Sequence, residues 1–318
     1  MLNYTHDSFA GSEVHGTFDV CLAWNWEYDV QLVTVFEAAC RAHGLSLLTV
    51  TPDTLDVTAS SLREGRLAFR ALWDRASDAD ASFGVLVDWA RRHASVRINP
   101  YELAQRAWDK SAMHSALVHK VATPTTIILP AYRDQPTLPP IDLGVLGGCF
   151  CIKPARRGGG EGVIVQANEL SHVITARLEY PNDCYLLQAH VTPVRISGRP
   201  AWFRVIYCAG EMFPCWWDMQ THQYTALTDV EEGRYGLTSL RSTVASIAEV
   251  CQLHLFSSEI ACTDQDTFVV VDYVNDPVDL RLQSHTPDGV PDAIVNAVAY
   301  HLAWFIRKHT DSRQISSS

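Results

Sequence analysis

The 318-residue sequence has no apolar run of the roughly 18–20 residues that a membrane-crossing helix needs. Residues 1–7 carry neither a basic nor an apolar segment, so we expect no secretory signal. Positively charged residues are also few: the sequence has 25 Lys and Arg and 36 Asp and Glu, which gives a net charge of −11. A chain this acidic lacks the broad basic surface that nucleic acids bind, and we expect neither a nucleic-acid nor a membrane partner.

Several catalytic signatures are missing as well. The 13 histidines form no H-E-x-x-H or H-x-H pattern, so the sequence predicts no zinc site. There is no G-x-S-x-G elbow, no G-x-x-x-x-G-K-[ST] loop and no G-x-G-x-x-G before a helix. The 9 cysteines are odd in number and lack a C-x-x-C pair. We therefore expect reduced, mostly buried thiols in a cytoplasmic protein.

The short apolar runs and amphipathic stretches that are present predict an α/β fold in three parts, residues 1–98, 99–192 and 193–318. In the first part, strands are expected at 18–24, 45–50, 68–73 and 96–99, and helices at 30–43 and 82–93. This alternation predicts a small parallel sheet.

The second and third parts combine further strands with helices. In the second, we expect strands at 123–129, 150–154, 163–165 and 185–188, and helices at 100–118 and 168–179. In the third, strands are expected at 202–208, 212–217, 257–261 and 267–273, and helices at 239–255 and 291–308. Residues 218–237 are polar and contain glycine, and we expect them to be mobile.

A glycine-rich segment at residues 156–162 is the most informative stretch. Four glycines in five positions let backbone N–H groups approach a ligand, so the segment suits a phosphate-covering loop between two strands, or an ordinary flexible hairpin. Lys153 lies on the strand before it and must point at solvent or at an anion, because burying an unpaired ammonium is costly. Lys110, taken alone, is a solvated helix lysine.

Acidic residues gather near the C-terminus. Glu259 lies on one expected strand, Asp272 lies on the next, and Asn275 follows. Two carboxylates and an amide oxygen are ligands that suit Mg²⁺. The alternative is structural: Asp272 as a cap or ion-pair partner, and Asp276 before Pro277 as the start of a turn.

Taken in order, these motifs resemble the ATP-grasp superfamily over nearly the whole chain. The set comprises Asp109-Lys110, Thr123-Pro124, Ile152-Lys153-Pro154, the glycine-rich segment, Leu187-Gln188, Arg204, Glu259, Asp272 and Asn275. The resemblance implies an ATP-grasp fold with an N-terminal Rossmann-like (pre-ATP-grasp) domain. ATP would then lie between a central and a C-terminal subdomain.

The resemblance also implies roles for single residues. Lys153 would contact the α- and β-phosphates, and Lys110 the phosphates or the base. Arg204 would lie near the phosphates. The loop closing over the triphosphate would comprise Gly158, Gly159, Gly160, Glu161 and Gly162, and the adenine would be held by Gln188 and by the backbone at His190 and Val191. Glu259, Asp272 and Asn275 would hold one or two Mg²⁺ ions.

This sequence departs from the family pattern at three places. The usual metal motif is Glu, one residue, then Asn, whereas here Asp272 precedes Asn275 by three positions or Tyr273 takes the acidic place. The step from Glu259 to Asp272 favours Asp272, with Asp276 in reserve. The segment after Gln188 lacks the frequent acidic residue, and Arg195 replaces the ribose-binding Glu.

The function that the resemblance implies is ATP-dependent ligation of a carboxylate to an amine through an acylphosphate. A small-molecule kinase of the same fold and a non-catalytic ATP-binding regulator are the alternatives. Arg281, just after the metal motif, either holds a substrate carboxylate or phosphate or forms a surface ion pair. The expected partners are small-molecule acid and amine substrates, and the resemblance is compatible with a homodimer.

Overall fold

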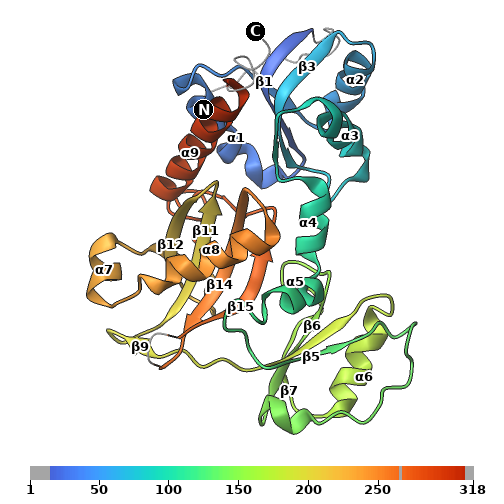
Figure 1. The fold of residues 1–318 in the computed structure, drawn as a ribbon, viewed down its shortest axis with the longest axis vertical. Helices are drawn as coiled ribbons and strands as arrows, with labels where there is room; N and C mark the ends of the chain where they lie inside the picture. The colour runs from blue at the N-terminus through green and yellow to red at the C-terminus, as the bar shows by residue number, and fades with distance from the viewer. Residues whose placement is uncertain (1–14, 265–266, 312–318) are drawn as a thin grey trace, which may run out of the picture. The chain divides into compact units, whose positions relative to one another are not determined.

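The computed structural model describes residues 15–264 and 267–311, which form two compact units (Figure 1). Unit 1 runs to Ile98 and resumes at Ala303, and unit 2 is Asn99–Leu302. The three-part division that the sequence suggests stays a prediction, and its boundary at residue 192 falls inside unit 2. The architecture is mixed α/β with several sheets, as expected.

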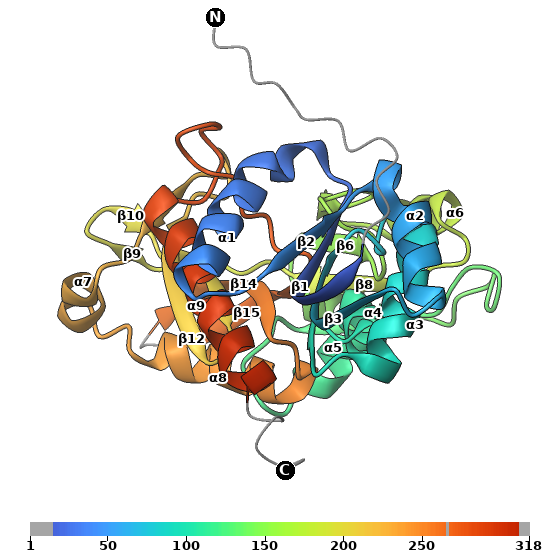
Figure 2. The ribbon, with the colours of Figure 1, turned by 90° about the horizontal axis from the view of Figure 1, so that it is seen from above.

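Unit 1 is built on a four-stranded parallel sheet with the order β2-β1-β3-β4. The strands are β1 (Gly16–Trp24), β2 (Leu47–Val50), β3 (Leu67–Arg75) and β4 (Val96–Ile98). The helices α1 (Val30–Ala42), α2 (Pro52–Arg63) and α3 (Gly84–His93) connect them. Because parallel connections are right-handed and the strand order reverses after β2, α1 lies on one side of the sheet and α2 and α3 on the other (Figure 2).

Helix α2 is not predicted by the apolar pattern, because its buried side includes the polar residues Thr58 and Ser61. Its start is marked instead by capping: Thr51 and Thr54 form a reciprocal capping box, and Pro52 occupies the first turn. These signals are readable in the sequence. They identify where a helix begins, however, and not which surface it will cover.

A buried ion pair joins a 3₁₀ turn of unit 1 to the end of a strand. Asp29 ends the 3₁₀ turn Glu27–Asp29, and Arg75 ends β3. The guanidinium donates from Nε to Asp29 Oδ2 at 2.7 Å and from Nη2 to Oδ1 at 2.8 Å. Both side chains are almost fully buried. The pairing satisfies both charges, so removing one partner leaves the other desolvated and uncompensated.

The first sheet of unit 2 is antiparallel, with the order β5-β8-β6-β7. Its strands are β5 (Thr126–Leu129), β6 (Phe150–Pro154), β7 (Ile164–Ala167) and β8 (Tyr185–Ala189). Helix α6 (Leu170–Glu179) buries Val173 and Ala176 in the same core as Phe150 and Ile152. The glycine-rich segment joins β6 to β7, so it is the turn of an antiparallel hairpin.

The single helix expected at residues 100–118 is wrong. The structure has two helices, α4 (Tyr101–Trp108) and α5 (Lys110–Leu117), separated by Asp109. Asp109 adopts an extended conformation, and its carboxylate accepts hydrogen bonds from the backbone N–H groups of Ser111 and Ala112. This N-cap ends one helix and starts the next, which places Lys110 in the first turn of α5.

The second sheet of unit 2 is antiparallel, with the order β13-β12-β11-β14-β15. Its strands are β11 (Trp202–Cys208), β12 (Glu211–Trp217), β13 (Tyr224–Ala226), β14 (Leu255–Cys262) and β15 (Phe268–Asn275). A short hairpin, β9 (Arg195–Ile196) and β10 (Arg199–Pro200), precedes it. The polar segment 218–237 contains β13 and the helix α7 (Asp229–Arg234), which begins at a capping box of Thr228 and Glu231.

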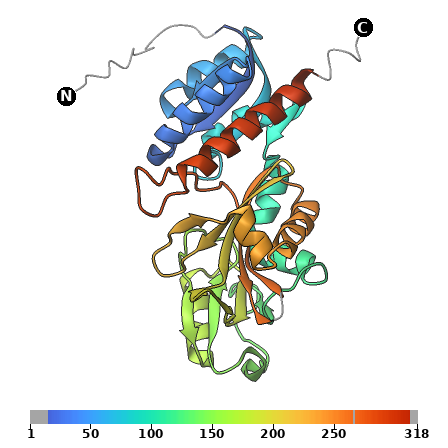
Figure 3. The same cartoon turned by 90° about the vertical axis from the view of Figure 1, so that its left-hand side faces the viewer.

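Helices cover one face of this second sheet. Helix α8 (Ser239–Cys251), coloured orange, lies against it in Figures 1 and 3. Leu240 and Val244 of α8 share a hydrophobic core with Phe203, Ile260 and Val270 of the sheet. Since side chains alternate along a strand, Arg204 and Glu259 project from the opposite face. The closing helix is α9 (Asp292–Asp311).

The thiol predictions agree with the structure. All nine cysteines are free, and six of them are buried. Burial raises the pKa of the Cys40 thiol to about 12, with smaller contributions from Asp19 and Glu37, so this thiol stays protonated. Across residues 15–264 and 267–311, every helix is too short or too polar to cross a membrane.

We predict that Asp29→Asn lowers the free energy of unfolding of unit 1 by about 3–5 kcal/mol, because it leaves the Arg75 guanidinium buried without a countercharge. Urea unfolding followed by circular dichroism measures the change. The matched control is Glu37→Gln, which removes an exposed pair with Arg41 and should cost about 0.3–0.5 kcal/mol. Equal losses in the two variants would contradict the assigned role of the buried pair.

Candidate functional site

A row of charged side chains crosses the open face of the second sheet. Arg204 on β11 lies directly opposite Glu259 on β14, and Glu259 lies directly opposite Asp272 on β15. Directly opposed residues of antiparallel strands share a face and approach closely. Arg204 Nη1 lies 3.3 Å from Glu259 Oε1. The three predicted residues are therefore brought together, as Arg204–Glu259–Asp272.

An irregular register between β14 and β15 adds Asn275 to this row. Asn275 is paired with Ser257, which lies two residues from Glu259 and hence on the same face. In a regular strand, residues three apart face opposite sides. The register shifts between the pairs insert extra residues into β15, so Asp272 and Asn275 share a face despite their odd spacing. The bulge thus accommodates the departure from the Glu-x-Asn pattern.

Burial and mutual charge define the electrostatics of the row. Glu259 is only 15% exposed, and this desolvation raises the pKa of its carboxyl group; Arg204 opposes the rise, and Asp272 adds to it. For Arg204, burial is the largest single influence and lowers the pKa of the guanidinium, but Glu259, Tyr224, Asp272 and Asp279 together outweigh it, so the net shift is upward. Arg204 therefore stays charged next to a carboxylate that is costly to ionise.

Lys153 extends from the other sheet to this row. It lies on β6, and its Nζ donates a hydrogen bond to the Val271 carbonyl at 3.2 Å. Val271 immediately precedes Asp272 on β15. The ammonium is also close enough to stabilise the charged form of Glu259. Two cations and two carboxylates, contributed by two sheets, thus lie in one place.

The glycine-rich hairpin turn contacts the other predicted lysine. Lys110 Nζ donates to the Arg157 carbonyl at 2.5 Å, and the Lys110 backbone N–H donates to the Ala155 carbonyl at 2.8 Å. Gly159, Gly160 and Gly162 have φ of 59°, 79° and 70°, which is backbone that residues with a Cβ rarely adopt. The helix start that carries Lys110 therefore lies at the base of this loop.

Gly162 has a second reason to be glycine. A Cβ atom there would lie 2.6 Å from Cε2 of Tyr180 and 3.1 Å from Cγ of Pro154. The Tyr180 hydroxyl donates to Glu161 Oε1 at 2.9 Å, and the Arg157 guanidinium lies 4.4 Å from the centre of the Tyr180 ring. Tyr180 thus holds the end of the loop. Glu161 points at this tyrosine.

A buried polar chain links Gln188 to the helix α5. Gln188 Nε2 donates to the Tyr273 hydroxyl at 2.8 Å, and the same hydroxyl lies 2.6 Å from His114 Nδ1. Burial lowers the pKa of His114, which favours the neutral imidazole next to the tyrosine hydroxyl. Gln188 Oε1 is buried and has no hydrogen-bond partner within the described part of the chain. These hydrogen bonds orient the Gln188 amide, and they leave its acceptor oxygen unsatisfied.

Tyr273 does not share a face with the charged row. It is 1% exposed and belongs to the core with the helices α4, α5 and α8. Of the two registers that the sequence left open, the structure places Asp272 beside Glu259. His190 and Val191 follow β8 directly, at the end of the strand that carries Gln188.

Two other candidate residues near the C-terminus, Asp276 and Arg281, are engaged elsewhere. Asp276 Oδ1 accepts from Asn99 Nδ2 at 2.8 Å, and Oδ2 accepts from Trp108 Nε1 at 3.2 Å, so this reserve ligand contributes to packing. Arg281 forms ion pairs with Asp279 at 2.7 Å and Asp288 at 2.9 Å. The sequence left two roles for Arg281, substrate binding or an ion pair, and in the structure it forms the ion pair.

The donor set of the row suits magnesium rather than a transition metal. In the described ranges, no three His, Cys, Asp or Glu side chains converge in a way that could hold a metal ion. The row offers two carboxylates and one amide oxygen from Glu259, Asp272 and Asn275. Mg²⁺ commonly takes one or two carboxylates and fills its other positions with water and phosphate oxygens. These residues fit that ion.

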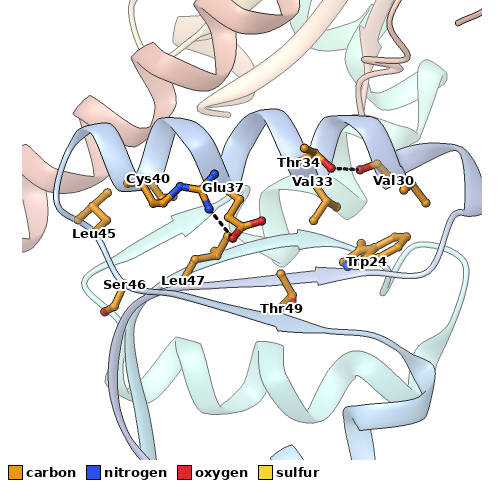
Figure 4. Close-up of a pocket in the computed structure, with 11 residues that line it drawn as sticks. Trp24, Val30, Val33, Thr34, Glu37, Cys40, Leu45, Ser46, Leu47 and Thr49 are labelled. Carbon is orange, nitrogen blue, oxygen red and sulfur yellow. Dashed lines mark hydrogen bonds and ion pairs between the residues drawn. The ribbon is translucent and has the colours of Figure 1, made fainter. Parts of the chain in front are cut away.

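One cavity, of about 590 Å³, lies in unit 1 between α1 and β2 (Figure 4). Trp24 and Thr49 line one end, Leu45 and Ser46 the other, and Glu37 projects from the helix between them. None of the predicted site residues lines it. A second cavity, of about 540 Å³, lies in unit 2 and includes Trp217 in its lining.

No family model matches the sequence, and no curated protein matches it either. Solved structures do. A D-cycloserine synthetase is 15% identical, with 92% of this chain and all of that chain aligned and a TM-score of 0.59. The D-alanine–D-alanine ligase of Bacillus anthracis in complex with ATP is 11% identical, covering 92% and 99%, with a TM-score of 0.59.

A third similar structure is an ATP-grasp ligase bound to a precursor peptide and AMPPNP. It is 12% identical, with 92% of this chain and 98% of that chain aligned and a TM-score of 0.60. Identities this low show a shared fold and leave the reaction open. The alignments extend over nearly the full length of each partner.

We predict that Tyr273→Phe lowers the free energy of unfolding by about 1–3 kcal/mol, because it leaves His114 Nδ1 and the Gln188 amide buried without their shared partner. Urea unfolding measures the loss. Tyr28→Phe is the control: Tyr28 is 53% exposed, and the loss of its hydroxyl should be nearly neutral. An unchanged urea midpoint in Tyr273→Phe would mean that these buried hydrogen bonds contribute nothing to the free energy of unfolding.

Proposed function

We propose that this chain, which has the ATP-grasp fold, is an ATP- and Mg²⁺-dependent ligase that joins a carboxylate to an amine through an acylphosphate. The observation that carries the proposal is the row Arg204–Glu259–Asp272, with Asn275 on the same face and Lys153 next to it. Cations suited to phosphate and oxygen atoms suited to magnesium lie side by side on one sheet face, as the binding of a magnesium–nucleotide complex requires.

The lysines and the loop supply the phosphate side of the proposed site. Lys153 and Arg204 would bind the triphosphate next to the carboxylates, and Lys110 lies at the base of the glycine-rich turn. The positive-φ glycines leave backbone N–H groups accessible to phosphate oxygens. Closure of this turn would exclude water from the reacting groups.

Gln188 supports adenine as the base. Its Nε2 is committed to Tyr273, so the amide presents Oε1, an acceptor. The exocyclic amino group of adenine is a donor and would satisfy this buried oxygen, whereas the carbonyl at the same place in guanine would not. The backbone at His190 and Val191, at the end of the same strand, would complete the base site.

Magnesium resolves an electrostatic conflict in this site. Two carboxylates on one face repel a triphosphate unless a cation lies between them. Mg²⁺, when bound, supplies that charge and screens the oxygens of the transferred phosphoryl group. Glu259, Asp272 and Asn275 would hold it. Arg204 would then remain as a fixed positive charge beside the phosphates.

The reaction that these groups support has two steps. An oxygen of the substrate carboxylate attacks the γ-phosphorus, the bond to the β–γ bridging oxygen breaks, and ADP leaves. The amine nitrogen then attacks the acyl carbon, the carbon–oxygen bond to phosphate breaks, and the amine loses a proton. Arg204 and Lys153 would stabilise the charge that spreads over the transferred group, which is catalysis by position and electrostatics.

The similar solved structures support this proposal. One carries ATP, another carries AMPPNP with a precursor peptide, and a third makes D-cycloserine. They do not select between a small acid and a peptide as substrate. The row of charges supports phosphoryl transfer in either case.

We predict that Mg²⁺ with AMPPNP raises the unfolding temperature by several degrees, since a ligand at about 100 times its Kd adds about 2.7 kcal/mol. Differential scanning fluorimetry measures the shift with and without Mg²⁺. In Asp272→Asn the shift should disappear, because the metal loses a charged ligand.

The control variant is Asp88→Asn, an exposed carboxylate of α3 in unit 1, which should keep the full shift. A wild-type chain that shows no shift at millimolar nucleotide would exclude the proposed site. A shift that survives in Asp272→Asn would move the metal elsewhere.

We also predict that phosphate release from ATP requires an acid and an amine together. A coupled phosphate assay over a panel of acid–amine pairs tests this, and Lys153→Ala should lower turnover by at least about a hundredfold. Release of ADP with the acid alone, giving a stable phosphorylated product, would instead identify the kinase alternative.

A further inference from the structure

The cavity of unit 2 borders the proposed site. It measures about 540 Å³, within the range of small-molecule pockets. The β9–β10 hairpin, the start of β11, the end of β12 and the loop after β12 surround it. Trp217 belongs to its lining, and the Arg204 Cζ atom lies 4.9 Å from the centre of the Trp217 ring. One indole therefore connects the cavity to the charged row.

The charge of the lining is positive although the chain is acidic. Arg195 and Arg199 line the cavity, and Asp218 is the one carboxylate among its described lining residues. Asp218 accepts hydrogen bonds from the backbone N–H groups of Thr221 and Gln220, which lower its pKa and tie it to its own turn. A free anion would therefore meet two guanidinium groups with little opposition.

In the part of the chain that the structure describes, neither arginine is neutralised by an ion pair. Within the described chain, no carboxylate lies within 4.0 Å of the guanidinium of Arg195 or Arg199. Arg195 donates to the Gly198 carbonyl in its own hairpin, and Arg199 stacks on the Trp216 ring, with 5.1 Å from Cζ to the ring centre. Glu231 is near enough for its pKa to be lowered by Arg199, but only as a minor contribution. An anion-binding function remains open to both.

The remaining lining is mixed: the three indoles of Trp202, Trp216 and Trp217 stand beside polar residues, among them Gln220, Gln223 and Thr225. Trp202 lies two residues before Arg204, and Trp217 two residues after Cys215, which is paired with Arg204. Both indoles therefore lie on the sheet face that carries the charged row. Trp217 is buried, and Trp202 is half-buried, so Trp202 offers the indole surface that a ligand can reach. A guanidinium in the same cavity as a partly exposed indole ring is a combination that binds a carboxylate attached to a planar group.

We propose that this cavity binds the non-reacting end of the acid substrate, and that this end is an aromatic group bearing a carboxylate. The inference rests on the proposed ligase function. The carboxylate held by Arg195 and Arg199 is not the one that is phosphorylated, because the charged row begins at Arg204, outside the lining. The substrate would thus present a second carboxylate to that row.

Three probes of similar size separate the effect of charge from the effect of ring planarity: phenylacetate, phenylacetamide and cyclohexylacetate. Each is titrated into the full chain without nucleotide, and binding is followed by ligand-observed saturation-transfer NMR, which detects weak affinities. We expect phenylacetate to bind about tenfold more tightly than either of the others. Equal affinity for all three would overturn the proposal.

Two variants test the location. Arg199→Gln should weaken phenylacetate binding about tenfold and leave phenylacetamide binding unchanged, and Trp202→Leu should weaken both aromatic probes. Arg92→Gln, an exposed arginine in the last turn of α3, is the matched control and should bind as the wild type does. If Arg199→Gln and Arg92→Gln bind phenylacetate equally, the cavity is not the site.

The Mg²⁺–AMPPNP shift separates this inference from the proposed function. Selective phenylacetate binding without a nucleotide shift would retain the pocket and overturn its place in a ligase. A nucleotide shift with three indistinguishable probes would retain the ligase and overturn the pocket. Selective binding together with the shift supports both.

Discussion

The pairing of β14 with β15 is the interaction on which the proposed site depends. Ordinary antiparallel register would place Asp272 and Asn275 on opposite faces of the sheet, because they are three residues apart. The bulged register places both on the open face, opposite Glu259 and Ser257. The pairing of β14 with β11 then adds Arg204. A change of one residue in this register would turn at least one proposed ligand toward the hydrophobic core.

A single buried hydroxyl, that of Tyr273, connects the second sheet of unit 2 to the first. Tyr273 projects from β15 away from the charged row and meets Gln188 of β8 and His114 of α5. Three polar groups in a core are tolerated because they bond to one another. Lys153, from the neighbouring strand β6, donates a hydrogen bond to the Val271 carbonyl of the same strand. Two hydrogen-bonded contacts with β15 thus tie the two sheets of unit 2 together.

The sequence predicted most elements correctly, and its errors have physical causes. Residues 100–118 carry continuous helical spacing, but the Asp109 side chain captures two backbone N–H groups and starts a new helix. Spacing alone cannot reveal this competition between a side chain and the helix ladder. Residues 52–63 are too polar for the apolar pattern, although Thr51 and Pro52 mark the start of α2. Residues 218–237 contain β13 and α7, both short elements.

The sequence by itself determined the α/β class, the order of the strands along the chain, and the residue types for phosphate and magnesium chemistry, because these follow from local periodicity and composition. The tertiary structure decided which of those residues meet. It placed Asp272 rather than Tyr273 beside Glu259, engaged Asp276 with Asn99, and paired Arg281 with Asp279. Strand register and long-range hydrogen bonds join residues that are far apart in the chain, so no local pattern encodes them.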